Sequence, residues 1–275
     1  PLPLLAILKS KLQNLKSTMF LLFSIDGMSP AALQAATPPN IAHLIAPGAS
    51  TMTARTVMPS VTLPCHTSML RGVDVPRHGI TSNTFAPLAR PVPSLFDVAY
   101  RQGLHCGFFY NWGPLRDLHE PESVAIDHYV HDAHRPEGDQ RVADATVQHL
   151  AGLDFAMVYL GWTDECGHMH GWMSPEYMQA IEDADRCVGQ ILHAAPNPTV
   201  LLQSDHGGHG QAHGTDCDED MIIPWILSGP AAKSSHQIQS PVRIFDTCPT
   251  IAHILGLPTA REWEGEPIHE ALAEV

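Results

Sequence analysis

The chain has 275 residues, 44% of them hydrophobic and 16% charged, and its formal net charge is -14. The hydrophobic content excludes a disordered chain, and the length is near the upper limit for one globular domain. The acidic excess repels polyphosphate backbones and argues against a general nucleic-acid-binding protein. The six cysteines form no CxxC pair and are typical of unpaired thiols in a reducing compartment.

Residues 1–18 differ in pattern from the rest of the chain. Their short apolar stretch precedes its lysines, whereas a secretory signal places positive charge first and ends at a small-residue cleavage site. No run of the sequence approaches the roughly 18 apolar residues of a membrane span. We therefore expect a cytoplasmic protein with no membrane partner. Residues 1–18 would be a leader or an expression remnant, and residues 19–275 a single domain.

Short apolar runs alternate with helical patterns along residues 19–275, which predicts an α/β fold. The runs expected to be strands are residues 19–25, 106–110, 155–160, 199–203 and 222–227. The segments expected to be helices are residues 40–45, 95–101, 141–150, 175 to about 193 (with Ser174 as its N-cap), and 245–255. The predicted architecture is a central, mostly parallel sheet flanked by helices on both faces.

Three acids lie at or shortly beyond the carboxyl ends of predicted strands: Asp26, Asp164 and Asp205. In open α/β sheets, that edge is where ligands bind. Any one of these acids is equally well explained as a turn or a helix cap. Their recurrence beside histidines favours a functional site, provided that the three strands are neighbours.

Two of these acids have histidines close by in the sequence. Asp164 is followed four residues later by His168, and Asp205 is followed directly by His206, with His213 in the same loop. Carboxylate oxygens and imidazole nitrogens are ligands that suit zinc. This set of ligands favours zinc over manganese, which is the alternative. Two such ions can clamp the attacking and leaving oxygens of an in-line displacement. The rival interpretation, a histidine-rich surface loop that holds stray metal, leaves the distant strand-end acids unexplained.

A hydroxyl nucleophile is suggested by the segment around Thr62, where Pro64 marks the start of a helix. Backbone N–H groups at a helix start favour a phosphoryl oxygen. In isolation, Thr62 is better explained as a simple helix cap. The nucleophile interpretation depends on the metals.

The ordered motifs resemble the alkaline phosphatase superfamily, and within it the nucleotide pyrophosphatase/phosphodiesterase (type I phosphodiesterase) family. The matching segments are FSIDG, TPPNIAHLIAPGA, VMPSVTLPCHTSMLRGVDVPRHGITSN, TDECGH, SDHGG, His213-Gly, IPWILSGP and FDTCPTIAHILGLP. Each segment alone is weak evidence, but their order agrees with that family. The resemblance implies an alkaline-phosphatase-like sandwich and a catalytic metallohydrolase domain over residues 19–275.

The resemblance also implies roles for individual residues. One zinc ion would be held by Asp164, His168 and His213, and a second by Asp26, Thr62, Asp205 and His206. Thr62 would attack phosphorus and form a covalent phosphothreonine. Asn83 would hydrogen-bond a phosphoryl oxygen together with the Thr62 backbone N–H.

His213 has a competitor, because the matching histidine of the family usually lies much further downstream and His209 is only four residues away. We prefer His213, which is followed by Gly-Thr and an acidic loop, residues 216–220, that we expect to be solvated. His66 is a candidate for a position behind the ligands. His78 is expected to shape the turn that leads to Asn83.

The expected substrate is a small phosphodiester, a phosphonate monoester or a dinucleotide pyrophosphate, accepted with broad tolerance. A phosphomonoester dianion needs extra positive charge, and the nucleophile segment has no arginine nearer in sequence than Arg55 and Arg71. Five aromatic residues are candidates for an apolar wall or for the core: Phe85, Phe109, Tyr110, Trp112 and Trp172. Alternatives are a phosphonoacetate-type hydrolase, a phosphomonoesterase, a phosphomutase, or a non-catalytic metal-binding protein. A sulfatase is disfavoured because Cys65 lacks a CxPSR context. The sequence does not indicate an oligomeric state.

Overall fold

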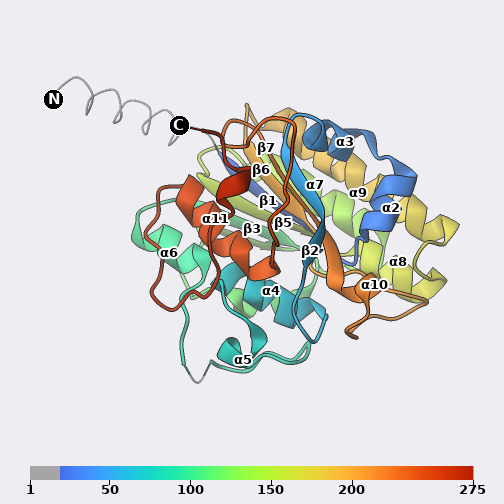
Figure 1. The fold of residues 1–275 in the computed structure, drawn as a ribbon, viewed down its shortest axis with the longest axis horizontal. Coiled ribbons are helices and arrows are strands. Elements are labelled where there is room, and N and C mark those ends of the chain that lie inside the picture. The colour runs from blue at the N-terminus through green and yellow to red at the C-terminus, as the bar shows by residue number, and fades with distance from the viewer. Residues whose placement is uncertain (1–18, 89, 275) are drawn as a thin grey trace.

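A computed structural model describes residues 19–88 and 90–274, and the expected leader lies outside these ranges. An eight-stranded sheet runs through the molecule in the order β4-β3-β5-β1-β6-β7-β2-β8 (Figure 1). The strands are β1 (Phe20–Ile25), β2 (Ala49–Arg55), β3 (Cys106–Tyr110), β4 (Ile126–Tyr129), β5 (Phe155–Leu160), β6 (Thr199–Gln203), β7 (Ile222–Ser228) and β8 (His236–Gln237). The five strands from β4 to β6 are parallel, and β7 is antiparallel to both of its neighbours.

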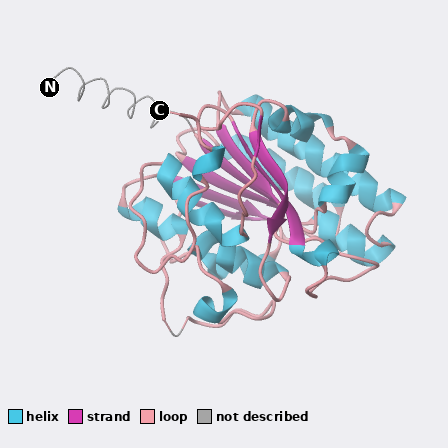
Figure 2. Cartoon of the chain, in the orientation of Figure 1, coloured by secondary structure: helices cyan, strands magenta, loops and turns pink. Residues whose placement is uncertain are grey.

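Helices cover both faces of the sheet, as the sequence predicts (Figure 2). The helices are α2 (Pro30–Ala36), α3 (Pro39–Ile45), α4 (Thr62–Arg71), α5 (Val75–His78), α6 (Leu95–Arg101), α7 (Pro136–His149), α8 (Trp162–His170), α9 (Pro175–Ala194), α10 (Asp218–Met221) and α11 (Thr247–Ile254), with 3-10 turns η1 (Gly113–Leu118), η2 (Ile244–Asp246) and η3 (His269–Ala271). Alternate residues of β1 point to opposite faces. Leu21 and Phe23 join the core under α2, α3, α7 and α9, and Leu22 joins the core under α4, α6 and α11. The predicted mostly parallel sheet between two helical layers is confirmed.

Some elements differ from the prediction. Strands β2 and β4 were not expected, because neither is an apolar run: β2 is rich in polar residues and only partly buried, and β4 has no fully buried residue. Helix α7 begins at Pro136, about one turn before the predicted start. The predicted last helix is divided into η2 and α11, and it stops at Ile254.

The order of the central strands positions the site. Strand β1 lies between β5 and β6 and is parallel to both, with Ile25 beside Leu160 and Ser24 beside Gln203. The carboxyl ends of these three buried strands therefore meet at one edge of the sheet, and the segments that carry the predicted acids begin there.

Candidate active site

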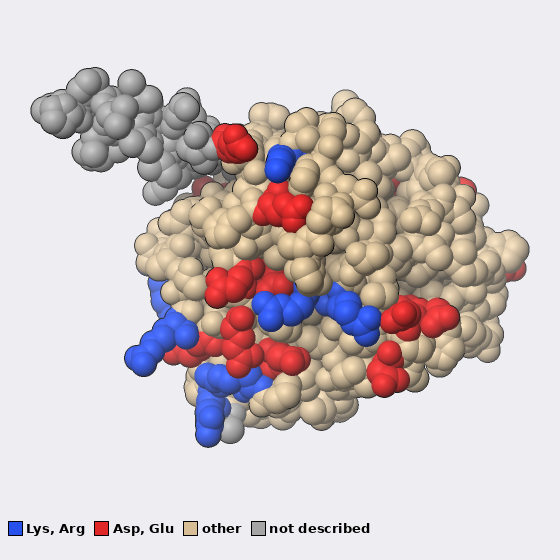
Figure 3. Space-filling model, in the orientation of Figure 1, with Lys and Arg blue, Asp and Glu red and all other residues tan. Residues whose placement is uncertain are grey.

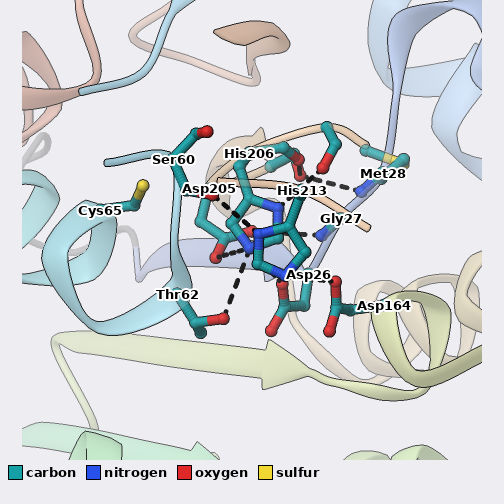
Figure 4. Close-up of polar contacts among 12 residues, drawn as sticks. Asp26, Gly27, Met28, Ser60, Thr62, Cys65, Asp164, Asp205, His206 and His213 are labelled. Carbon is teal, nitrogen blue, oxygen red and sulfur yellow. Dashed lines mark hydrogen bonds and ion pairs between the residues drawn. The ribbon is translucent and has the colours of Figure 1, made fainter. Parts of the chain in front are cut away.

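The structure brings the seven predicted ligand residues together at the carboxyl edge of β5, β1 and β6. All of them except His168 are labelled in Figure 4. We call this group the edge cluster; its members are Asp26, Thr62, Asp164, His168, Asp205, His206 and His213. Asp26 follows β1 directly and Asp205 lies two residues after β6. Asp164 lies in the first turn of α8, which begins almost directly after β5. All three acids are buried, with exposed fractions of 2%, 0% and 7% for Asp26, Asp205 and Asp164.

Gly27 allows these acids to approach one another. Its φ angle is +65°, a left-handed conformation that glycine adopts at little cost, and a Cβ at this position would lie 3.0 Å from Asp164 Oδ1. Its N–H donates to Asp205 Oδ1 at 3.2 Å, and its carbonyl accepts from Trp172 Nε1 at 2.9 Å. The turn after β1 is therefore fixed against both neighbouring carboxylates.

Thr62 is the first residue of α4, but it is not the helix cap. The cap residue is Val61, which offers no side-chain hydrogen bond, and Asn83 Oδ1 instead accepts from the Leu63 N–H at 2.9 Å. The Thr62 hydroxyl is buried and lies 3.4 Å from His206 Nε2. The simple helix-cap interpretation of Thr62 is therefore wrong, and Asn83 is held beside the first turn of α4 with its amide nitrogen available.

The three histidines of the edge cluster share one orientation. In each, Nδ1 lies against a backbone carbonyl, which places the proton on Nδ1 and leaves a lone pair on Nε2. The Nδ1–O distances are 3.0 Å from His168 to Gln211, 2.8 Å from His206 to Gly207 and 2.8 Å from His213 to Ser60. Metal-ligating histidines are characteristically fixed in this way.

The Nε2 atoms of these histidines are aimed at the three acids. His206 Nε2 lies 3.3 Å from Asp26 Oδ1 and 3.3 Å from Asp205 Oδ2. Asp164 lies between the other two histidines, with Oδ2 3.3 Å from His168 Nε2 and Oδ1 3.5 Å from His213 Nε2. The rings of His206 and His213 stack at a centroid distance of 3.8 Å, so the two groups of ligands adjoin.

Negative charge is crowded at this edge, and no Lys or Arg of the described residues pairs with it. Burial, followed by repulsion from Asp205 and Asp164, raises the pKa of Asp26 well above its usual value. Burial and repulsion from Asp164 raise the pKa of Asp205 to about 7. Burial alone would raise the pKa of Asp164 too, but the contacts with His168, His206 and His213 outweigh it and lower that pKa. Asp26 Oδ1, Asp164 Oδ1 and Asp205 Oδ2 accept no hydrogen bond in the described part of the chain.

The edge cluster fits metal ions on geometric grounds. Two N or O ligands, each about 2.0–2.1 Å from a tetrahedral zinc ion, are separated by about 3.3–3.4 Å. The Nε2–carboxylate distances of 3.3–3.5 Å match that separation. The three buried, unsatisfied carboxylate oxygens face the Nε2 atoms of His206 and His213, and His168 Nε2 faces the other oxygen of Asp164. Cations between these groups would satisfy both the oxygens and the lone pairs.

His209, the competitor of His213, lies outside the edge cluster. Its side chain is 47% exposed, and its Nδ1 contacts Asp220 Oδ1 at 2.7 Å. Asp220 is completely buried and also accepts from the backbone N–H and hydroxyl of Thr215, at 2.9 and 2.8 Å. The expectation that residues 216–220 form only a solvated loop is therefore wrong at Asp220, which anchors the loop that carries His213.

Two side chains lie behind the ligands: His66, which the sequence analysis expected there, and Tyr159, which it missed. Tyr159, which lies beside Ser24 in the sheet, donates its hydroxyl to Asp26 Oδ2. His66 is buried, with Nδ1 2.8 Å from the Thr62 carbonyl and Nε2 2.8 Å from Ser24 Oγ. Burial lowers the pKa of His66 to about 3, which keeps the ring neutral behind the nucleophile segment.

Asp139 was also missed, although it positions α8. Its Oδ1 accepts from the backbone N–H groups of Gly161 and Trp162 at 3.0 and 3.3 Å, and from Asn111 Nδ2 at 2.7 Å. These backbone groups lie at the start of the helix that carries Asp164. A side chain from α7 thus performs the capping that α8 lacks in its own sequence.

The predicted turn and aromatic residues have mixed outcomes. His78 accepts from the Ile80 N–H at 3.0 Å and so shapes its turn as expected. Phe109 and Tyr110 belong to the core, and Trp172 packs against the edge cluster, with its ring 5.3 Å from that of His168. Trp112 helps to line a cavity of about 270 Å³ beyond the ends of β3 and β4, on the same side of the sheet as the edge cluster.

On the face of the described residues that Figure 3 shows, charged side chains do not form a basic groove. On the face shown in Figure 3, basic and acidic side chains are interspersed. Arg55 pairs with Asp218 at 3.1 Å, and the guanidinium of Arg71 donates to the carbonyls of Val92 and Leu118. Within residues 19–88 and 90–274, no helix is both long and apolar enough to cross a membrane.

The fold and the edge cluster define an α/β protein with a candidate binuclear metal site at the carboxyl edge of its sheet. The model of the type I phosphodiesterase / nucleotide pyrophosphatase family matches residues 20–219, and the chain belongs to that family. The family predicted from the motifs is therefore confirmed.

Curated relatives carry related names. The chain is 24% identical over 223 residues to ectonucleotide pyrophosphatase/phosphodiesterase family member 7 of Rattus norvegicus, covering 71% of this chain and 51% of that protein. It is 26% identical over 190 residues to the 2,3-bisphosphoglycerate-independent phosphoglycerate mutase of Acaryochloris marina, covering 61% of this chain and 34% of the mutase. The chain thus spans about half the length, or less, of these relatives.

Solved structures share the fold. An inactive variant of murine ectonucleotide pyrophosphatase/phosphodiesterase 5 in complex with AMP superposes with a TM-score of 0.79 at 14% identity, covering 94% of this chain and 100% of that chain. A 2-O GAG sulfatase superposes with a TM-score of 0.71 at 15% identity, covering 91% and 73% of the two chains. At these identities the likeness shows the fold alone, and it agrees with the predicted alkaline-phosphatase-like sandwich.

Proposed function

We propose that this protein is a two-metal phosphodiester hydrolase in which Thr62 is the nucleophile. The observation that carries the proposal is the shared orientation of His168, His206 and His213. Each is fixed through Nδ1 by a backbone carbonyl and directs Nε2 at a buried carboxylate. A buried hydroxyl lies within the same group, which a merely structural histidine cluster does not require.

The ligands divide into two sets around the stacked rings of His206 and His213. Asp26, Thr62, Asp205 and His206 would hold one ion, and Asp164, His168 and His213 the other. The proposed ions are zinc, with manganese as the alternative, because the donors are imidazole nitrogens and carboxylate oxygens. When bound, such ions lower the pKa of a hydroxyl or water and offset charge on phosphoryl oxygens.

Thr62 carries the covalent step. Its hydroxyl loses a proton to solvent, Oγ1 forms a bond to phosphorus, and the bond from phosphorus to the leaving oxygen breaks on the opposite side, which gives a phosphothreonine. Water then attacks phosphorus, the bond to Oγ1 breaks, and the hydroxyl regains its proton. Asn83, whose Oδ1 is held by the Leu63 N–H, would direct its amide N–H groups at a phosphoryl oxygen.

The charge of the site favours a substrate with one ionised phosphoryl oxygen. No Lys or Arg of residues 19–88 or 90–274 forms an ion pair with Asp26, Asp164 or Asp205, whose charged-pair partners in these ranges are all histidines. Arg55 and Arg71 are engaged elsewhere. Phosphodiesters, phosphonate monoesters and nucleotide pyrophosphates meet this condition.

Three alternatives share the same ligands. The similarity to phosphoglycerate mutase supports a phosphomutase as one alternative. A phosphonoacetate-type hydrolase would differ only in the leaving group of its substrate, and a phosphomonoesterase only in the charge of its substrate. A non-catalytic metal-binding protein would keep the metals without turnover. A sulfatase remains disfavoured: Cys65, in a TLPCHTS context, is buried and its thiol accepts from Thr56 Oγ1 at 3.1 Å.

The deciding experiment is a p-nitrophenyl panel of monoester, diester, phenylphosphonate and sulfate, with metal content measured on the same samples. We expect two ions in the edge cluster, preference for the diester or phosphonate, and loss of turnover by at least about 10³-fold in Thr62→Ala. Preference for the monoester would move the assignment to a phosphomonoesterase. Undiminished turnover in a folded Thr62→Ala protein would end the proposal.

Asn83→Asp is a matched second variant. It keeps an acceptor for the Leu63 N–H, so the start of α4 is preserved, but it removes the proposed donor to phosphoryl oxygen. Removing one such donor costs about 10²–10³ in kcat in enzymes that use it. Because Asn83 is exposed, we expect a loss at the lower end, and an unchanged kcat would remove Asn83 from the proposed mechanism.

A further inference from the structure

A second cluster of metal-ligating side chains lies outside the edge cluster. His209, Cys217 and Asp220 place one ligand atom each within 4.8 Å of one another, and we call these residues the loop triad. The loop triad shares no residue with the edge cluster, but it closes the loop that carries His213. Of the six cysteines, Cys217 is the one that is not buried.

The distances suit a tetrahedral ion. A thiolate about 2.3 Å and an imidazole nitrogen about 2.0–2.1 Å from zinc are separated by about 3.5 Å. His209 Nδ1 and Cys217 Sγ are 3.6 Å apart. His209 Nδ1 and Asp220 Oδ1 are 2.7 Å apart, shorter than the tetrahedral separation of about 3.4 Å, because they form a direct hydrogen bond. The side chain of His209 is 47% exposed, so its ring is free to withdraw by that difference.

The carboxylate of the loop triad is already oriented. Thr215 donates its backbone N–H and its hydroxyl to Asp220 Oδ2, which leaves Oδ1 as the atom that faces His209. Metal-binding carboxylates are commonly supported by hydrogen bonds of this kind. On the other side, the partly exposed Cys217 and His209 leave room for water as a fourth ligand.

We propose that the loop triad is a third metal site, which binds a borderline or soft divalent cation such as zinc through His209 Nδ1, Cys217 Sγ and Asp220 Oδ1. Thiolate and imidazole select such ions over magnesium or calcium. The ion joins the two ends of the segment 209–220. The site is independent of the catalytic proposal, because none of its ligands belongs to the edge cluster.

Cobalt(II) is the probe, because it replaces zinc and gives a near-ultraviolet sulfur-to-cobalt charge-transfer band only when a thiolate is bound. The edge cluster contains no cysteine, so the band reports on the loop triad alone. We expect the metal-free full chain to bind three equivalents of cobalt and to show the band. Cys217→Ser should abolish the band and bind two equivalents, and His209→Gln should weaken binding of the third equivalent by at least about tenfold.

Two controls keep the test specific. Cys65→Ser, which changes the buried thiol nearest to the nucleophile in sequence, should keep the band and the third equivalent. Thr62→Ala should also keep the band, so a failed catalytic proposal and a failed third site are told apart. The proposal is overturned if the wild-type chain shows no band, or if the band survives in Cys217→Ser.

Discussion

The edge cluster and the loop triad both combine acids with histidines, but their carboxylates are in opposite states. In the edge cluster, Asp26, Asp164 and Asp205 each keep a buried oxygen that accepts no hydrogen bond in the described residues. In the loop triad, both oxygens of Asp220 are satisfied by His209 and Thr215. In the first group, protons or a cation would offset the burial and the repulsion, whereas the hydrogen bonds of the second are complete without either.

Under the two proposals, this difference would separate a site that depends on metal from one that accepts it. Unpaired buried carboxylates raise the free energy of the folded state unless protons or cations neutralise them. Satisfied carboxylates instead stabilise the loop around them and exchange a hydrogen bond for an ion at little cost. We therefore expect changes in the edge cluster to affect chemistry first and changes in the loop triad to affect the loop first.

The largest expected effect comes from comparing two histidines, one from each cluster. His213→Ala should lower kcat/KM for the p-nitrophenyl diester by about 10³-fold, because a metal contributes several kcal/mol to the transition state and each 1.4 kcal/mol is about tenfold. His209→Ala should lower the same kcat/KM by at most about tenfold, which is the lower end of the range for residues that support metal ligands without binding the metal themselves. Metal content should fall in the first variant at the edge cluster. Equal losses in the two variants would contradict the division between the clusters.

Asp139 is a buried acid that belongs to neither cluster, and it can be compared with the acids of both. Asp139 also has an oxygen that accepts no hydrogen bond in the described residues, but no histidine lies against it, and burial raises its pKa from 3.8 to about 7. Because the folded state holds the proton more tightly than the unfolded state, this group's contribution is fully present below pH 3.8 and is lost as pH rises towards 7.

Asp139→Asn should remove that dependence. The amide keeps an oxygen for the N–H groups of Gly161 and Trp162 and carries no charge at any pH. The free energy of unfolding of the variant should therefore rise relative to wild type by about 2–3 kcal/mol between pH 5 and pH 8, from roughly 1.4 kcal/mol per pH unit up to the raised pKa. Urea unfolding at several pH values measures the difference. A constant difference across that range would show that Asp139 is already ionised in the folded protein.

The contrast among these acids also explains what the sequence could predict. Asp26 and Asp205 follow apolar runs that fold as buried parallel strands, so their place at the sheet edge follows from local pattern. The roles of Tyr159 and Asp139 depend on strand register and on how α7 packs beside β5, which no local pattern encodes. Asp220 was misjudged because an acidic run resembles a solvated loop, although its side chain turns inward.

The smallest expected effect is on the free energy of unfolding, which an Asp→Asn substitution should change in opposite directions in the two clusters. In metal-free protein, Asp205→Asn should raise the free energy of unfolding by about 1 kcal/mol, because it removes a buried charge while the amide oxygen still accepts from the Gly27 N–H. Asp220→Asn should lower it by about 1 kcal/mol, because one of the oxygens that accept from Thr215 and His209 is replaced by a donor. Melting temperatures in excess chelator should move by roughly 2–4 °C in opposite directions. If both variants are destabilised, Asp205 is held by contacts that do not need a cation, and the distinction between the clusters is lost. If Asp205→Asn is stabilising only after metal removal and destabilising with metal bound, its carboxylate is retained for the ion and not for the fold.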